Sequence, residues 1–123
     1  MKKLVAWLLN KKYRTLKVAV GFWAMAHALD IVSTAMSLGI VPGAFESNVF
    51  ATDPETMAFS LGRVVFIKLA FGLLTIVFPA VFLYVATERE DLASLPLWYN
   101  GVHALPATMQ NLGILYLYLS YSR

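Results

Sequence analysis

The chain has 123 residues, of which 59% are hydrophobic and 14% are charged, and its formal net charge is +3. An average soluble domain is roughly 45–50% apolar and about 25% charged, and a soluble domain of this length could not bury so much apolar surface. The composition excludes a soluble enzyme, a disordered tail and a typical nucleic-acid binder, and it predicts a single integral membrane domain. Because the sequence contains no cysteine, disulfides, zinc–thiolate sites and iron–sulfur clusters are excluded as well.

Residues 1–17 form a basic segment that contains six of the ten Lys and Arg residues. Its apolar run, residues 4–9, is short for a signal peptide and is followed by Asn10 and two lysines instead of a cleavage site of small residues. We therefore expect a retained segment on the membrane surface, with Trp7 and Tyr13 at the level of the lipid headgroups. A frayed and solvated N-terminus is the alternative.

Three long apolar stretches follow, over about residues 18–41, 61–86 and 95–121. Each is at least as long as the roughly 20 residues that cross a hydrocarbon layer about 30 Å thick. Because backbone groups in lipid must satisfy their own hydrogen bonds, we expect an all-α fold with three transmembrane helices, and residues 18–123 as one domain. Pro79 and Pro106 lie inside these stretches, and each is expected to kink its helix.

Two charged connections join the predicted spans. Residues 42–60 are acidic, and Asp53-Pro54 is typical of an N-cap and first turn at the start of the second helix. The basic N-terminal segment and Arg89, in the short connection 87–94, come to lie on one side of the membrane. The positive-inside rule then predicts a cytoplasmic N-terminus and a C-terminus on the outer side of the cell membrane.

Asp30 and Lys68 fall deep inside predicted spans, where a charge costs on the order of 2.5–3.5 kcal/mol. His27, Asp30 and Thr34 are spaced so that they share one face of the first helix. By helix rise, Asp30, Asn111 and Lys68 lie about 18, 15 and 10 Å from the outer ends of their helices. We therefore predict that Asp30 pairs with Lys68. The predicted polar cluster in the outer half of the membrane consists of Asp30, Thr34, Lys68 and Asn111.

The simplest interpretation of this pair is a lock between helices without any chemistry, because pairing alone accounts for intramembrane charges. A proton or ion relay, contact with a partner subunit and contact with a lipid headgroup are the alternatives. Arg63 lies near the outer boundary of the second span, where its long side chain can reach the headgroups. Polar neighbours within the spans include Ser33, Asn100 and Gln110 together with the two histidines.

His27 and His103 lie at similar depths, roughly 12–15 Å from the cytoplasmic ends of their helices. Two such histidines on different helices are candidate ligands for a haem or a pigment, or for a metal ion with Asp30 as third ligand. The competing interpretation is that each histidine is hydrogen-bonded across helices, as polar side chains in membranes commonly are. On that interpretation no cofactor is expected.

Catalytic motifs are missing from the sequence, which has no GxSxG, HExxH or P-loop pattern, so we expect a protein that is not an enzyme. The pairs Ala24-xxx-Ala28 and Ala35-xxx-Gly39 have the spacing that lets membrane helices approach closely.

Three helices bury little surface among themselves. We therefore expect a non-catalytic membrane subunit or accessory protein that stabilises a larger assembly or a homo-oligomer, in contact with the lipid bilayer and with other subunits or copies of itself. An oligomeric ion or proton channel using Asp30 and Lys68 is one alternative, and a haem- or pigment-binding subunit using His27 and His103 is another. A phage holin fits the size and charge but not the paired intramembrane charges.

The polar residues of the first half stand in a recognisable order: Asp30-Ile-Val-Ser-Thr34, Gly39, Glu46-Ser-Asn48 and then Lys68. This order resembles a family of small bacterial and archaeal membrane proteins of unknown function. Val49 stands where the family has a proline, and Asn111 matches the family's asparagine in the third span. The resemblance covers about residues 25–115. It implies three spans and a shared polar centre that includes Glu46 and Asn48, with the loop folded toward Lys68 or Arg63, and it implies no activity.

Overall fold

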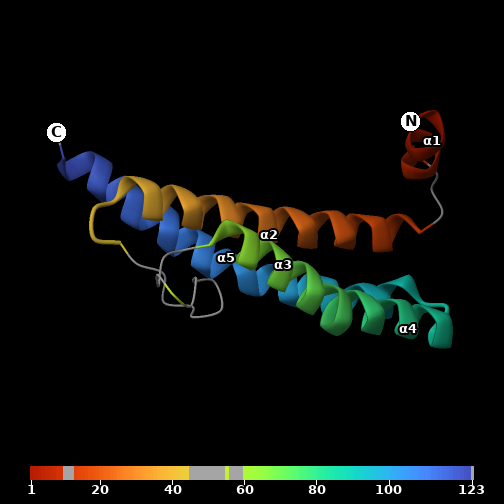
Figure 1. The fold of residues 1–123 in the computed structure, drawn as a ribbon. Coiled ribbons are helices and arrows are strands. Elements are labelled where there is room, and N and C mark those ends of the chain that lie inside the picture. The colour runs from red at the N-terminus through yellow and green to blue at the C-terminus, as the bar shows by residue number, and fades with distance from the viewer. Residues whose placement is uncertain (10–12, 45–54, 56–59, 123) are drawn as a thin grey trace.

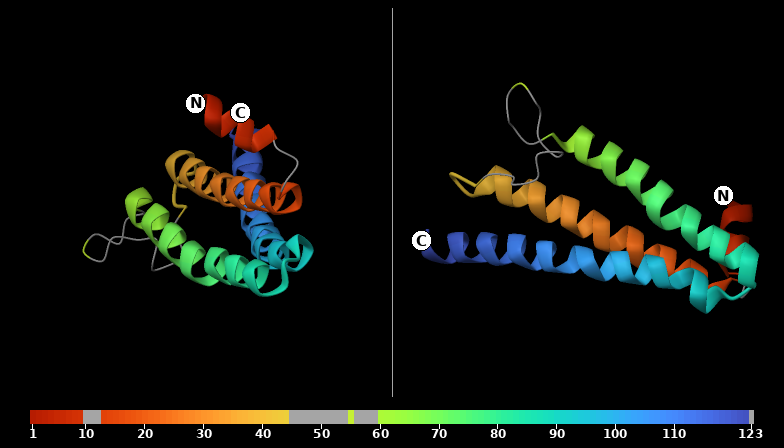
Figure 2. Two further views of the ribbon diagram at one scale, coloured as in Figure 1. Left: turned by 90° about the vertical axis from the view of Figure 1, so that its right-hand side faces the viewer. Right: turned by 90° about the horizontal axis from the view of Figure 1, so that it is seen from below.

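The computed structural model describes residues 1–9, 13–44, 55 and 60–122, and every regular element in these ranges is a helix. The all-α prediction is therefore confirmed. The helical elements are α1 (Lys2–Leu9), α2 (Arg14–Ile40), α3 (Leu61–Gly72), η2 (Leu73–Val77), α4 (Phe78–Thr87) and α5 (Glu90–Tyr121). The elements α3, η2 and α4 follow one another without a break and form one rod. This rod packs against α2 and α5, which run parallel to each other, whereas α1 lies across the direction of α2 (Figures 1 and 2).

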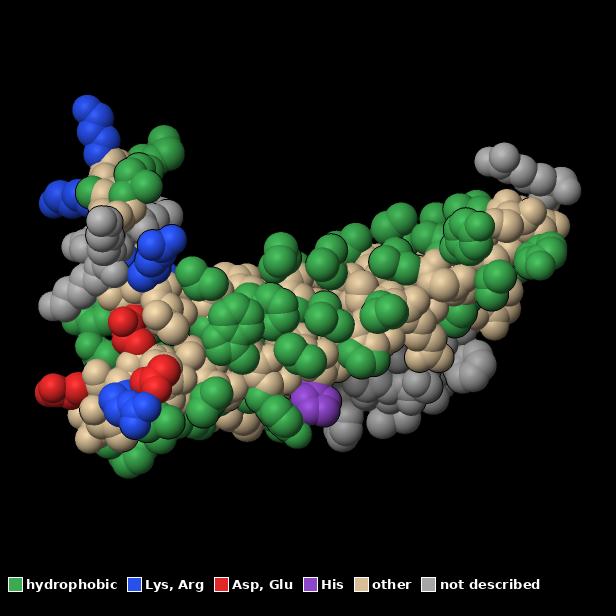
Figure 3. Space-filling model, turned by 180° about the vertical axis from the view of Figure 1, so that it is seen from behind, with side chains coloured by type: hydrophobic (Ala, Val, Ile, Leu, Met, Phe, Trp, Pro, Cys, Tyr) green, Lys and Arg blue, Asp and Glu red, His purple; other side chains and the backbone are tan. Residues whose placement is uncertain are grey.

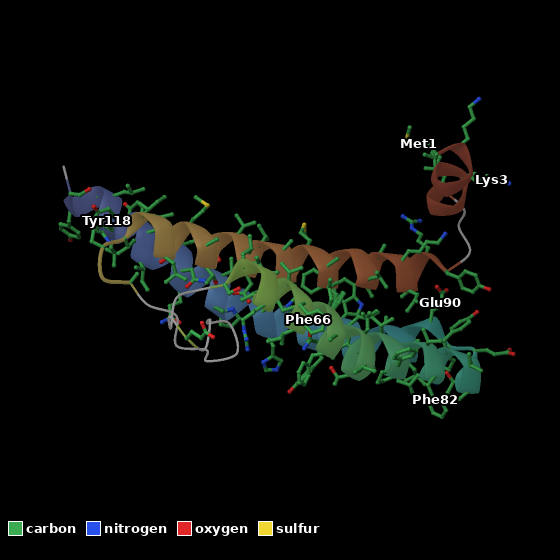
Figure 4. The ribbon with its side chains drawn as sticks, in the orientation of Figure 1. Met1, Lys3, Phe66, Phe82, Glu90 and Tyr118 are labelled. Carbon is green, nitrogen blue, oxygen red and sulfur yellow. The ribbon has the colours of Figure 1, made fainter. Side chains whose placement is uncertain are left out.

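Helices α2 and α5 both begin before the apolar stretches that start near residues 18 and 95. Acidic residues in the first turn of α5 suit its positive end, and Glu90 is one of them. The Glu90 carboxylate also accepts a hydrogen bond of 3.3 Å from the backbone N–H of Leu16, in the first turn of α2. Figure 4 shows Glu90 beside this turn. A side chain of α5 thus caps α2, whose own N-cap residue, Tyr13, provides no side-chain cap.

Small residues line the contact between α2 and α5. On α2 the buried residues Ala19, Ala26 and Ser33 recur every seven positions, which keeps one face of a helix against a parallel neighbour. The facing buried residues of α5 include Leu97, Gly101, Ala104, Thr108 and Leu115. The pairs predicted to mediate close approach are different ones: Ala24, Ala28 and Gly39 are exposed, so they lie outside this contact.

The rod formed by α3, η2 and α4 contains a π-helical segment, η2, which ends two residues before Pro79. Here the backbone N–H of Phe78 donates to the carbonyl of Leu73, five residues back. Proline has no N–H and its ring crowds the carbonyl four residues before it, so the helix widens at this point. Helix α5, in contrast, continues through both Pro96 and Pro106 as one element.

Two of the described helical rods, Arg14–Ile40 and Leu61–Thr87, are long and apolar enough to cross a membrane. Large apolar side chains are exposed along them, and Phe66 and Phe82 are each 72% exposed and project away from the neighbouring helices (Figure 4). Charged side chains on the face drawn in Figure 3 gather at the end formed by α1 and the turn between α4 and α5, while hydrophobic side chains cover much of the body.

Candidate functional site

An ion pair joins α2 to α3 near the middle of the bundle. Lys68 Nζ lies 2.7 Å from Asp30 Oδ2, and the two side chains are 29% and 16% exposed. The structure thus brings together the two charged residues that the sequence predicts to meet. Lys68 projects from the side of α3 that also carries the buried residues Val64 and Gly72, one turn before and one turn after it.

His27 extends the ion pair toward α5. Its Nδ1 lies 3.2 Å from Lys68 Nζ, and its Nε2 lies 2.6 Å from Asn100 Oδ1. An ammonium group can only donate, so Nδ1 is the acceptor, and the ring hydrogen is assigned to Nε2, which donates to the amide oxygen. The hydrogen bonds therefore select the neutral imidazole with its hydrogen on Nε2.

Trp23 completes the arrangement from the same face of α2. Its indole Nε1–H donates a hydrogen bond of 2.8 Å to Asn100 Oδ1, the oxygen that also accepts from His27. We call this set the polar network: Trp23, His27, Asp30, Lys68 and Asn100. It connects three helices through one unbroken series of hydrogen bonds, and no buried side-chain nitrogen or oxygen in the described residues lacks a partner.

Two glycines make room for the aromatic members of this region. A Cβ atom on Gly72 would lie 2.6 Å from Cζ2 of Trp23, and one on Gly101 would lie 2.7 Å from Cε1 of Phe22. Real Cβ atoms do not approach other atoms so closely, so both positions require glycine as the helices now pack. The indole ring of Trp23 is therefore held against α3 while its N–H reaches α5.

Asn111 forms a separate contact one turn farther along α2. Its amide nitrogen donates to Thr34 Oγ1 at 2.8 Å and to Ser33 Oγ at 3.3 Å. Ser33 in turn donates to the backbone carbonyl of Asp30 at 3.1 Å. The predicted cluster of four residues is thus divided: Asp30 pairs with Lys68, and Thr34 pairs with Asn111, because the two acceptors stand on successive turns of α2.

The histidines do not meet as a pair of ligands. His27 points into the polar network, whereas His103 is exposed and its ring lies edge-on to Tyr99 with the centroids 4.4 Å apart. The described residues contain no group of three or more His, Cys, Asp and Glu side chains suited to a metal ion. The geometry therefore gives no support to shared ligation by His27, His103 and Asp30.

Only some of the residues predicted near the outer connection are described by the structure. Glu46, Asn48 and Asp53 lie outside the described residues. Helix α3 begins at Leu61 with Ser60 as its N-cap, and the Ser60 hydroxyl accepts a hydrogen bond from the backbone N–H of Arg63. The Arg63 side chain is exposed.

Two members of the polar network, Asn100 and Trp23, are not among the predicted site residues. The available signal is spacing: Trp23, His27 and Asp30 stand at i, i+4 and i+7, on one face of a helix. A tryptophan in line with a histidine and an aspartate has an N–H that needs an acceptor when it is buried.

The fold and the network define an all-helical protein with two helices suited to a membrane and a polar network between three helices. Comparison of the chain with protein-family models, with curated proteins and with solved structures finds no match.

Proposed function

We propose that the protein is a non-catalytic integral membrane subunit that crosses the bilayer three times and assembles with other membrane helices. The two apolar rods and the charged end of the molecule support a membrane position. With its 32 residues, α5 is longer than the roughly 20 residues needed to span the hydrocarbon layer. Helix α1, with Lys2 and Lys3, and the start of α2, with Arg14, lie at the same end of the molecule as the turn between α4 and α5 that carries Arg89 (Figure 1), which supports a cytoplasmic location of that end.

The observation that carries the proposal is a pair of polar side chains on the outside of α5. His103 and Gln110 are exposed and lie about 12 and 22 Å from residue 95 by helix rise, inside a hydrocarbon layer about 30 Å thick. Neither side chain has a hydrogen bond within the described part of the chain. In lipid such groups find partners on a neighbouring helix, so we expect a neighbouring helix to supply the partners that the described residues do not.

The hydrogen bonds of the polar network support a role for its residues in holding the helices together. Its five side chains are joined by hydrogen bonds, and the series ends at an amide and an indole, Asn100 and Trp23, which do not titrate near neutral pH. A hydrogen-bonded network of this kind holds three helices in one arrangement. The face that remains for interaction is then the outside of the bundle.

The mass of the protein in its native lipid tests the proposal. The membrane is extracted with a polymer that keeps a lipid annulus, and the particles are analysed by native mass spectrometry. We expect complexes heavier than the 13.7 kDa chain. A lone chain of that mass at every lipid-to-protein ratio would contradict the proposal.

An oligomeric proton or ion channel is the second candidate. The observation in its favour is the contact of three groups able to carry a proton, since Lys68 bonds both His27 and Asp30. The termination of the series at Asn100 weighs against a continuous path. Proton and ion flux into liposomes distinguishes the two: a channel requires flux that Asp30→Asn abolishes, and flux unchanged by this substitution excludes the channel.

A further inference from the structure

We infer that the outer face of α5 binds the same face of a second copy of this chain, in a parallel pair with a two-fold axis along the membrane normal. The inference rests on the proposed function and names the partner of the polar side chains described there. The outer face consists of Tyr99, His103, Gln110, Gly113 and Leu117.

These residues form one continuous face of α5. They follow one another at spacings of four, seven, three and four residues, which keep them on one side of an α-helix. The buried residues Gly101, Ala104 and Thr108 lie on the opposite side, against α2. Tyr99 is 70% exposed and Leu117 is 53% exposed, so the face is open along its length.

The chemistry of the face requires a polar partner in the membrane. Gln110 carries two donors and an acceptor, and neutral His103 carries one donor and one acceptor. Acyl chains have no hydrogen-bonding groups, whereas a neighbouring helix that presents both donors and acceptors can pair with these side chains.

A second copy is such a helix. All copies insert with the same orientation, so a two-fold axis along the membrane normal sets each residue of α5 opposite its own counterpart. A glutamine amide can donate to and accept from another glutamine amide, and a neutral imidazole can do the same with another imidazole. The outer face contains no Lys, Arg, Asp or Glu, so no like charges meet across the axis.

Gly113 allows the two helices to approach at the outer half of this face. A Cβ atom built at Gly113 has no other atom within 4 Å, so its surface is open to a neighbour. Glycine beside a polar residue is a common feature of closely packed membrane helices. The pair Gln110 and Gly113 therefore combines a hydrogen-bonding group with a site of close contact, one turn apart.

The cysteine-free sequence permits a direct test by disulfide crosslinking in membranes. Gly113→Cys introduces the only thiol at the proposed contact, and Val32→Cys introduces one on α2, where Val32 is 54% exposed at a similar distance from the outer helix end. Copper phenanthroline and air oxidise the thiols, and a denaturing gel without reductant separates single from crosslinked chains. We expect a crosslinked dimer for Gly113→Cys and little or none for Val32→Cys.

A third variant tests the polar contact itself. Gln110→Leu in the Gly113→Cys chain removes the amide pair, and interhelical hydrogen bonds in membranes contribute about 0.6–2 kcal/mol. We expect the apparent dimer dissociation constant to rise about threefold to thirtyfold. Leu69→Ile, at a position of α3 that is 56% exposed and lies outside the proposed contact, should leave it unchanged.

The outcomes separate this inference from the proposed function. Equal crosslinking of the two single-cysteine chains contradicts a specific contact through α5. Absence of crosslinking together with heavier native complexes that contain a different protein overturns the inference and leaves the proposed function standing. Absence of crosslinking together with a lone 13.7 kDa chain overturns both.

Discussion

Two ion pairs of the described residues, Lys68 with Asp30 and Arg89 with Asp91, differ in their surroundings more than in their geometry. Lys68 and Asp30 are 2.7 Å apart with side chains 29% and 16% exposed, and they connect α2 to α3. Arg89 and Asp91 are 2.5 Å apart with side chains 60% and 62% exposed, two residues apart at the start of α5. The shorter distance alone would suggest that the second pair matters more for stability. Burial reverses this expectation, because a water-exposed pair is screened and contributes little to stability, whereas loss of one partner from a buried pair is costly.

Removal of one partner of the inner pair is expected to have the largest effect. Lys68→Met leaves the Asp30 carboxylate within the bundle without its ammonium partner, which typically costs about 3–5 kcal/mol. Steric-trapping or detergent-unfolding measurements give the free energy of unfolding. The double variant Asp30→Asn with Lys68→Met serves as the control, and it should lose less than Lys68→Met alone. A double variant that loses the sum of both single losses would show that the two residues are not coupled.

Disruption of the tight packing around the polar network is expected to have the second-largest effect. Gly72→Ala places a methyl group 2.6 Å from the ring of Trp23, so the indole must move from its acceptor on Asn100. Overpacking of this kind costs about 1–3 kcal/mol. The indole N–H resonance of Trp23 should shift together with the loss of stability. Gly62→Ala on the same helix has no atom within 4 Å of the new Cβ and should leave both properties nearly unchanged.

At the charged end, a contact between helices should matter more than the ion pair beside it. Glu90→Ala removes the carboxylate that caps α2 through Leu16, and loss of a cap costs about 0.5–2 kcal/mol. Unfolding of the variant in lipid micelles measures this loss. Glu88→Ala removes an equal charge from the same turn without removing the cap. If the two variants unfold alike, the carboxylate of Glu90 acts only as a general charge.

The exposed pair should give the smallest effect. Hydrogen bonds from the Arg89 guanidinium hold the pKa of the Asp91 carboxyl below its ordinary value. A carboxyl with a lowered pKa in the folded state adds stability above its unfolded pKa, and this contribution disappears as the pH falls through the folded pKa. Asp91→Asn should therefore lower the thermal midpoint slightly at pH 7, and the difference should disappear as the pH falls through the folded pKa of Asp91. Added salt should reduce the difference at pH 7. A large or salt-independent effect would place this pair in the same class as Lys68 and Asp30.

The polar contacts also differ in whether they can be predicted from the sequence. Asp30 and Lys68 are predictable because a charge within an apolar stretch needs a partner, and only helix rise is required to match their depths. The partners of His27 and Asn111 are not predictable in this way. They depend on the rotation of each helix about its axis, which small buried residues such as Ala26 and Gly101 determine and which depth alone does not contain.

The predicted starts of α2 and α5 lie four and five residues after the observed starts, whereas the other predicted ends of the spans agree with the structure to within one residue. Hydropathy marks where the chain is apolar, whereas a helix continues into polar residues as long as its end groups find partners. Glu90 illustrates both effects, since it lies in the first turn of α5 and also caps α2. The π-helical segment before Pro79 had a visible cause in the proline, but the form of the distortion depends on neighbours that the sequence does not position.

The π-helical segment η2 sets the angular phase of everything that follows it in its rod. In an unbroken α-helix, eight residues advance the side-chain direction by more than two full turns, so Ala80 would be rotated by roughly 80° away from the side that carries Gly72. The turn of η2 takes up one additional residue, and both Gly72 and Ala80 are buried. The segment therefore corrects the rotation between α3 and α4. It accommodates one residue more than a regular α-helix would, so that the buried sides of α3 and α4 face the same neighbouring helices.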